Sequence, residues 1–320
     1  MNAIRTLPIP PRLCLALLWP LLSALPAQAV VDGQLAAGSS MQDTLAGVAS
    51  LVIDGSAGCS GALLAGGGWI LTAAHCVTDA NGLLDAQTVA VSLLGGMLSA
   101  SVSAEDILVY DGWTGSVGLN NDLALLRLDT ALTGVAGYSI YDGQVGVGSE
   151  VLIAGYGLGG SGSSGANNSS GSFGTLRWGW NEYDSLNGSG GAVLYDFDDG
   201  TRSHNALGRS SSLGLDDEAS IAGGDSGGPS FVCDDSGCSL VGVHSFIGRL
   251  DQGDIDATLN ASFGEVAGDT LLTTAAVRSW LAALTTVSAV PEPATLALWL
   301  AGLAWLAWLA RRTPRIRPCP

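Results

Sequence analysis

Lysine is absent from this sequence of 320 residues, and all 12 basic residues are arginines. Two of them lie within residues 1–29, and four, together with one acid, lie within residues 291–320. The region between keeps six basic and 28 acidic residues, a net charge of −22. Because nucleic-acid binding depends on patches of positive charge, we expect no nucleic-acid partner. The abundance of glycine, alanine, leucine, serine and valine suits an exported, β-rich protein with many turns.

Cysteine is also scarce, with six in the chain and one of these near each end. The other four are spaced as two pairs, Cys59 with Cys76 and Cys233 with Cys238, and an exported protein meets an oxidising environment in which disulfides persist. Closing the first loop would stabilise the fold by about 3 kcal/mol on a chain-entropy estimate. The second pair brackets the turn-like sequence Asp234-Asp235-Ser236-Gly237, so a disulfide across a hairpin, a metal site and free thiols all stay open.

Long apolar runs occur at the two ends of the chain. The first, at residues 13–25, follows a short basic region and precedes Ala27-Gln28-Ala29, the small-x-small pattern of a signal peptidase site. We therefore expect residues 1–29 to be a signal peptide that directs export. The alternative is a membrane anchor, but the run is short for a span and interrupted by proline.

The second run, residues 294–310, consists of 17 residues without charge and is followed by a cluster of arginines. Its length is at the lower limit for crossing a bilayer. The positive-inside tendency leaves the arginines in the cytoplasm and the acidic domain outside, the side to which a signal peptide delivers it. The two ends thus predict the same topology.

Between these ends the apolar segments are short, frequently alternating or β-branched, and separated by glycine, asparagine, aspartate and serine. Many short strands at this spacing predict an all-β barrel or sandwich. Residues 158–174 are dominated by glycine, serine and asparagine and predict a surface loop. Apolar residues at helical spacing predict one closing helix over 272–284. The expected strands include Val48–Ile53, Trp69–Thr72, 88–94, 123–128, 150–154, 192–197 and 240–246.

Two segments carry a candidate base and a candidate acid. His75, in Thr72-Ala73-Ala74-His75-Cys76, comes just past an expected strand end, where a disulfide at Cys76 would hold it rigidly. By itself it could equally be a metal ligand or a packed surface residue, although no second His/Cys pair has zinc spacing. Asp122 lies at the start of an apolar strand, where a carboxylate can hold an imidazole in one tautomer. Alone, Asp122 is better explained as a residue that caps a turn or a strand.

A third segment, Gly223-Gly224-Asp225-Ser226-Gly227-Gly228-Pro229, surrounds a serine with glycines. Such a backbone can turn sharply and bring N–H groups together, so that a substrate carbonyl reaches the hydroxyl and its developing oxyanion is bound. The alternative is an ordinary glycine-rich turn without a catalytic role.

In these three motifs, their order His, Asp, Ser and their separations, the sequence resembles the trypsin/chymotrypsin family of serine peptidases from about residue 30 to residue 284. The resemblance implies an all-β fold of two six-stranded antiparallel β-barrels with the site in the cleft between them. The closing α-helix and a separate C-terminal hydrophobic helix are added to it from the sequence pattern. The expected boundaries are 1–29 for the signal peptide, 30–286 for the peptidase domain (barrels at about 30–145 and 146–270, closing helix 272–284) and 287–320 for the tail.

The same resemblance implies roles for individual residues. Ser226 is the nucleophile, His75 the general base and then acid, and Asp122 the residue that orients and stabilises the imidazolium. The backbone N–H groups of Gly224 and Ser226 form the oxyanion hole. No metal and no organic cofactor are expected.

Val30-Val31-Asp32-Gly33 resembles the mature N-terminus of the family, whose freed α-amino group forms an ion pair with the acid before the nucleophile, here Asp225. This terminus directly follows Ala29. We hypothesise that signal peptidase itself creates the active N-terminus, with no separate zymogen step.

The family's primary specificity pocket has its floor six residues before the nucleophile, where this sequence has Ser220 rather than an acid. Cleavage after Lys or Arg is therefore disfavoured. Ser245 is expected behind Asp122, Phe246 in the usual aromatic position, and Ile247 where many relatives have glycine, which narrows the pocket. A preference for small or medium apolar side chains before the scissile bond follows.

Cys59 and Cys76 match the family's disulfide beside the histidine, whereas Ala222 stands where the family has a cysteine. The disulfide that braces the pocket is thus missing, and Cys233 with Cys238 is a candidate local substitute. The remaining histidines of the domain, at positions 204 and 244, are interpreted as structural or surface residues.

Val290-Pro291-Glu292-Pro293, the apolar run and the basic end resemble the PEP-CTERM sorting signal of Gram-negative bacteria. The resemblance implies an exosortase-type processing enzyme as a partner besides signal peptidase, membrane attachment through 294–310 that is transient or permanent, and a location in the cell envelope, at the surface or in the extracellular matrix. A plain membrane anchor is the alternative.

The sequence therefore predicts an exported serine endopeptidase that acts on proteins or peptides through an acyl-enzyme. The alternative is a catalytically silent module of the same fold that binds partners at the cell surface, since a fold does not guarantee its chemistry.

Overall fold

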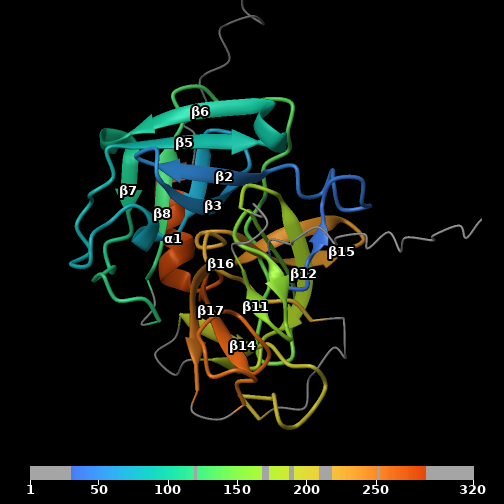
Figure 1. The fold of residues 1–320 in the computed structure, drawn as a ribbon. Coiled ribbons are helices and arrows are strands. Elements are labelled where there is room, and N and C mark those ends of the chain that lie inside the picture. Colours follow the sequence, from blue (N-terminus) through green and yellow to red (C-terminus); the bar gives the residue numbers. More distant parts are fainter. Residues whose placement is uncertain are drawn as a thin grey trace, which may run out of the picture.

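The structure is a computed structural model that describes residues 30–118, 121–167, 173–186, 191–208, 218–250 and 253–285. Two antiparallel sheets dominate it, and the expected all-β class is confirmed. Figure 1 shows the first sheet, in blue to teal, above the second, in yellow-green to orange.

The first sheet has seven strands in the order β6-β5-β2-β3-β4-β8-β7. Its two edge strands, β6 and β7, follow one another in the chain and are separated only by the 3₁₀ turn η3 (Ala104–Asp106). So short a turn can join opposite edges only if the sheet curls until its edges meet. The strands are β2 (Val48–Ile53), β3 (Ala57–Leu63), β4 (Trp69–Thr72), β5 (Thr88–Leu93), β6 (Leu98–Ser103), β7 (Ile107–Val109) and β8 (Ala124–Arg127).

The second sheet has eight strands in the order β1-β12-β9-β15-β16-β17-β14-β13. β12 and β13 are far apart in this order but are separated by only Tyr183 and Asp184, so this sheet also curls. The strands are β1 (Gln34–Leu35), β9 (Glu150–Gly155), β12 (Arg177–Glu182), β13 (Ser185–Leu186), β14 (Ala192–Asp196), β15 (Pro229–Asp234), β16 (Gly237–Arg249) and β17 (Glu265–Leu271).

If β6 with β7 and β12 with β13 are each counted as one bent strand, and β1 is set aside as an addition, each sheet has six strands. This arrangement is consistent with the expected double barrel. The N-terminal segment differs from expectation: β1 pairs with β12, and Val31 forms a bridge with Ser220. Residues 30–35 therefore lie against the second sheet rather than in the first barrel.

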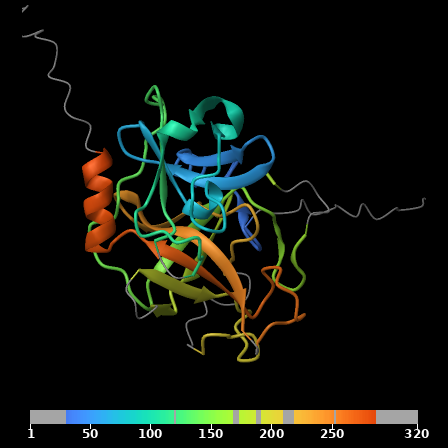
Figure 2. The same cartoon turned by 90° about the vertical axis from the view of Figure 1, so that its left-hand side faces the viewer.

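The two sheets share a core. Leu71 and Leu125 of the first sheet and Leu152 and Phe231 of the second belong to one cluster of buried side chains. The helix α1 (Ala275–Thr285) adds its buried face to this cluster, and Figure 2 shows it at one side of the molecule. Its observed bounds agree closely with the helix expected at 272–284. Each sheet also encloses a separate apolar cluster of its own.

The glycine-rich stretch expected as a surface loop over 158–174 contains a short hairpin, β10 (Gly160–Ser161) with β11 (Gly165–Ala166). Among the described residues no helix is long and apolar enough to cross a membrane. The predicted signal peptide (1–29) and the predicted sorting tail with its hydrophobic helix (287–320) lie outside the described residues.

Candidate active site

His75 lies in η1 (Ala74–Cys76), a single 3₁₀ turn that directly follows the end of β4. A disulfide between Cys59 of β3 and Cys76 ties this turn to the sheet. The turn is thereby fixed on both sides of the histidine. The imidazole keeps a quarter of its surface exposed, so a substrate can reach it.

Asp122 precedes β8 and is completely buried. One carboxylate oxygen, Oδ1, accepts a hydrogen bond from the backbone N–H of His75 at 2.8 Å. The other, Oδ2, lies 2.7 Å from His75 Nδ1 and accepts a hydrogen bond from the Ser245 hydroxyl at 2.5 Å. With its Nδ1 proton held by a carboxylate, a neutral imidazole leaves the lone pair on Nε2 free to take a proton.

Ser245 reaches Asp122 because of an irregularity in the second sheet. The pairing of β16 with β17 shifts register between His244 and Phe246, so Ser245 is the extra residue of a β-bulge. A bulge re-aims a side chain that would otherwise follow the regular alternation of the strand. The buried carboxylate is thus held by both sheets.

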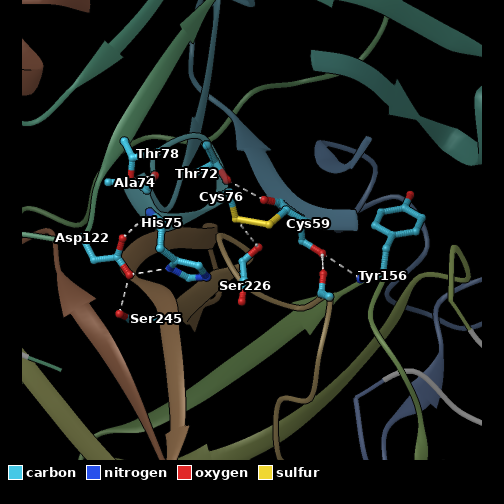
Figure 3. Close-up of a disulfide and its surroundings, with 12 residues drawn as sticks. Cys59, Thr72, Ala74, His75, Cys76, Thr78, Asp122, Tyr156, Ser226 and Ser245 are labelled. Atoms are coloured by element: carbon cyan, nitrogen blue, oxygen red, sulfur yellow. Dashed lines mark hydrogen bonds and ion pairs between the residues drawn. A yellow bond between two sulfur atoms is a disulfide. The ribbon is translucent and has the colours of Figure 1, made fainter. Parts of the chain in front are cut away.

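Ser226 lies in the loop that leads into β15, and its backbone is docked onto the segment that carries His75. Its carbonyl oxygen accepts a hydrogen bond from the N–H of Ser60 at 2.8 Å and lies 3.6 Å from Cys76 Sγ. Gly227 has a φ of +80°, and a Cβ there would clash with the Thr72 hydroxyl and the Ser60 carbonyl. Only glycine permits this approach, and Figure 3 shows Ser226 beside the His75 ring.

The same loop presents backbone donors. Asp225, Gly227 and Gly228 donate their N–H groups to carbonyl groups at 2.8–3.0 Å. Within the described part of the chain, the N–H groups of Gly224 and Ser226 make no such bond. Gly224 has a φ of +96°, a backbone conformation that suits glycine. Two unengaged amides next to a serine hydroxyl are suited to bind an oxyanion.

Asp225 is completely buried beneath this loop. Its carboxylate accepts hydrogen bonds from the backbone N–H groups of Gly157 (2.7 Å) and Ala222 (2.9 Å), and the backbone N–H of Val30 lies near enough to lower its pKa slightly. Burial raises the pKa of Asp225 from 3.8 to about 6, because loss of solvent disfavours the charged form more than these hydrogen bonds favour it. The backbone of Val30 therefore lies close to the acid that precedes the serine.

The residues predicted to form the specificity pocket lie in two segments, Ser220 before the loop of Ser226 and Ser245 to Ile247 on β16. Ser220 is buried and exchanges backbone hydrogen bonds with Val31 at 2.8 and 3.1 Å. Phe246 lies over Gly268, where a Cβ would overlap its ring, and Ile247 is partly buried against the second-sheet core. Ser245 is turned toward Asp122, to which its hydroxyl donates a hydrogen bond.

Cys233 and Cys238 are joined by a disulfide, opposite each other at the turn between β15 and β16. Both pack against the core shared by the sheets, whereas Ala222 packs in a different cluster. This disulfide therefore braces the hairpin turn and not the segment of Ala222. Among the described residues, no group of three or more His, Cys, Asp or Glu side chains could hold a metal ion.

Sequence reasoning missed a second buried His–Asp pair. His244 is completely buried, and its Nδ1 lies 2.9 Å from Asp269 Oδ1. The other oxygen of Asp269 accepts hydrogen bonds from the hydroxyls of Tyr183 and Ser230. His244 also exchanges backbone hydrogen bonds with the loop residues Gly227 and Gly228. Residues 240–245 of β16 are all buried, so the available signal was that His244 directly follows the apolar run Leu240–Val243 of a strand.

Replacing Asp269 with Ala is expected to lower the free energy of unfolding by about 3–5 kcal/mol, because three buried polar partners lose their acceptor. The matched control is Asp199→Ala, which breaks the more exposed pair of Asp199 with His204 and should cost about 1 kcal/mol or less. Denaturant unfolding of both variants measures the difference. Equal losses would contradict a structural role for the buried pair.

Comparison with known proteins identifies the family to which the chain belongs. The family model for trypsin matches residues 37–258, which is more than half of the chain. Brachyurin from Leptuca pugilator is 32% identical over 114 residues, a match that covers 34% of this chain and 49% of brachyurin. The aligned part thus spans about half the length of that relative. By its fold, its family match and this relative, the chain belongs to the trypsin family of serine peptidases.

Proposed function

We propose that this protein is a serine endopeptidase whose triad is His75, Asp122 and Ser226. The observation that carries the proposal is the buried Asp122, which holds the His75 ring at 2.7 Å beside Ser226. A buried carboxylate in this place stabilises the imidazolium that forms during acyl transfer. Family membership supports serine peptidase activity in general, and the contacts of these three residues support their roles.

In the proposed reaction, Ser226 Oγ attacks the scissile carbonyl carbon while its proton passes to His75 Nε2. The oxyanion is bound by the N–H groups of Gly224 and Ser226. The C–N bond then breaks and the leaving amine takes the proton from Nε2. Water attacks the resulting ester, gives a proton to Nε2, and the return of that proton to Ser226 Oγ releases the acid product.

A fluorophosphonate is expected to label the folded protein, and Ser226→Ala should abolish the label. Asp122→Asn should slow peptide hydrolysis by a factor on the order of 10³–10⁴, because the imidazole loses its preferred tautomer. Ser279→Ala, an exposed serine on α1, serves as the control and should label normally. Absence of labelling in the folded wild-type protein would leave the silent binding module as the better account.

We also propose that the active chain begins at Val30. Val30 is completely buried and has a φ of +53°. A β-branched residue is strained in this conformation, but the torsion exists only while a residue precedes it. Cleavage after Ala29 would remove the strain and place a charged α-amino group beside Asp225, whose carboxylate lies close to the Val30 N–H.

This proposal predicts how stability depends on pH. With residue 29 attached, the pKa of Asp225 is about 6 in the folded state against 3.8 as its ordinary value, so folding takes up a proton between them. Stability should then fall as pH rises from about 4 to about 6, by up to about 3 kcal/mol. A charged α-amino group at Val30 lowers the pKa of Asp225, so stability no longer falls over this pH range. Urea unfolding from pH 4 to 7 compares the chain that keeps residue 29 with the chain that begins at Val30. Identical dependence of stability on pH in the two would refute the ion pair.

The proposed specificity follows from two residues. Ser220 is uncharged, and Ile247 has a large apolar side chain. A peptide library should show cleavage after small or medium apolar residues. Ile247→Gly should extend the preference to larger side chains by widening the pocket. A profile dominated by Arg or Lys in the wild-type protein would refute the assignment.

We further propose export by a signal peptide over residues 1–29 and sorting through the tail at 287–320, by signal peptidase and an exosortase-type enzyme at the envelope of a Gram-negative cell. Mass spectrometry of the mature protein should find a chain without residues 294–310. Retention of those residues would instead indicate a plain membrane anchor.

A further inference from the structure

A groove of about 370 Å³ lies beside the nucleophile loop. Four parts of the chain line it: the segment that follows β1, the turn η2 (Leu94–Gly96) between β5 and β6, Tyr156 just after β9, and the lead-in to β12. In Figure 1 the dark blue segment before β2, the β5–β6 turn and the start of β12 lie on one side of the molecule. The main lining side chains are Ala36, Gln42, Leu94, Met97, Tyr156 and Leu176.

The chemistry of the groove differs from that of the chain as a whole. The protein has a formal net charge of −17, yet none of the described residues that line the groove is charged. Met97 is 76% exposed, so a large apolar side chain stands in solvent at its edge. Covering such surface with apolar groups is favourable in proportion to the area removed from water. The groove therefore suits aliphatic or aromatic side chains.

Hydrogen bonds connect this groove to the nucleophile loop. The N–H of Tyr156 donates to Ser60 Oγ at 2.9 Å, and the Ser60 hydroxyl donates to the Gly224 carbonyl at 3.0 Å. The ring of Phe173, next to the groove, covers Gly224, where a Cβ would lie 2.7 Å from it. Phe173 thus contacts the loop of Ser226, and its chain neighbour Gly174 lines the groove.

The position of the groove indicates which part of a substrate it would meet. Figure 3 shows Tyr156 and Ser245 on opposite sides of Ser226. The residues proposed for the specificity pocket, Ser220 and Ser245 to Ile247, receive the chain before the scissile bond. The chain after the bond must leave on the other side, toward Tyr156. Phe173 and the Cys59–Cys76 disulfide occupy the immediate surroundings of the loop, so the groove lies beyond the first leaving-group residue.

We propose that this groove is a second specificity site, which binds an apolar side chain two to four residues after the scissile bond. The proposal rests on the proposed peptidase function and adds a selectivity that the pocket does not supply. Leu94, Met97 and Leu176 form its apolar walls, and Tyr156 links it to the loop that carries Ser226.

Capture of the acyl-enzyme by added peptides tests the proposal. A short ester that lacks any residue after the scissile bond forms the acyl-enzyme, which water or a peptide amine then attacks. The amine gives its proton to His75, and Ser226 Oγ leaves and takes that proton back. Tetraglycine amides with Leu at position two, three or four serve as amines. Leu at one of these positions should raise capture over Gly about fivefold, as expected for a half-buried Leu side chain.

Met97→Ser and Leu176→Ser should each remove most of this preference. The control is Leu186→Ser, an exposed leucine on β13 at the edge of the second sheet, which should keep it. Fluorophosphonate labelling in parallel reports whether each variant is folded. Equal capture of Gly and Leu peptides by an enzyme that hydrolyses the ester would overturn the groove assignment. Loss of ester hydrolysis and of labelling in the wild type would instead overturn the proposed function.

Discussion

The burial of the Asp122 carboxylate is the constraint on which the arrangement of this molecule depends. A buried charge is costly unless hydrogen bonds satisfy it. Here the donors come from both sheets, His75 from the first and Ser245 from the second. The two sheets must therefore pack in one arrangement around this carboxylate. The same hydrogen bonds hold the imidazole in one orientation.

The rest of the site follows from how the second sheet is joined to the first. The glycines around Ser226 let its loop approach the Ser60 and Thr72 segment more closely than any side chain would allow. The bulge at Ser245 and the apolar core shared by both sheets keep the site residues of the two sheets in place. Reactive groups on separate halves of the chain are thus positioned by packing rather than by local sequence.

Beneath the loop lies a layer of buried polar groups that a purely apolar core would not need. Asp225 accepts hydrogen bonds from the backbone N–H groups of Gly157 and Ala222, and His244, which is paired with Asp269, exchanges backbone hydrogen bonds with Gly227 and Gly228. These groups reduce stability when any partner is missing, because a buried polar atom without a hydrogen bond is expensive. In return, a network of this kind favours one arrangement of the loop over its alternatives.

Local pattern determined much of this protein. Alternation and turn residues located strands such as β2 and β4, helical spacing located α1, and the motifs around positions 75, 122 and 226 named the candidate site. Only the tertiary structure decided that β1 joins the second sheet, that His244 is paired with Asp269, and that a neutral groove lies beside Gly224. The physical reason is that each of these depends on contacts between segments far apart in the chain, whereas strand alternation, helical spacing and glycine turns are properties of neighbouring residues.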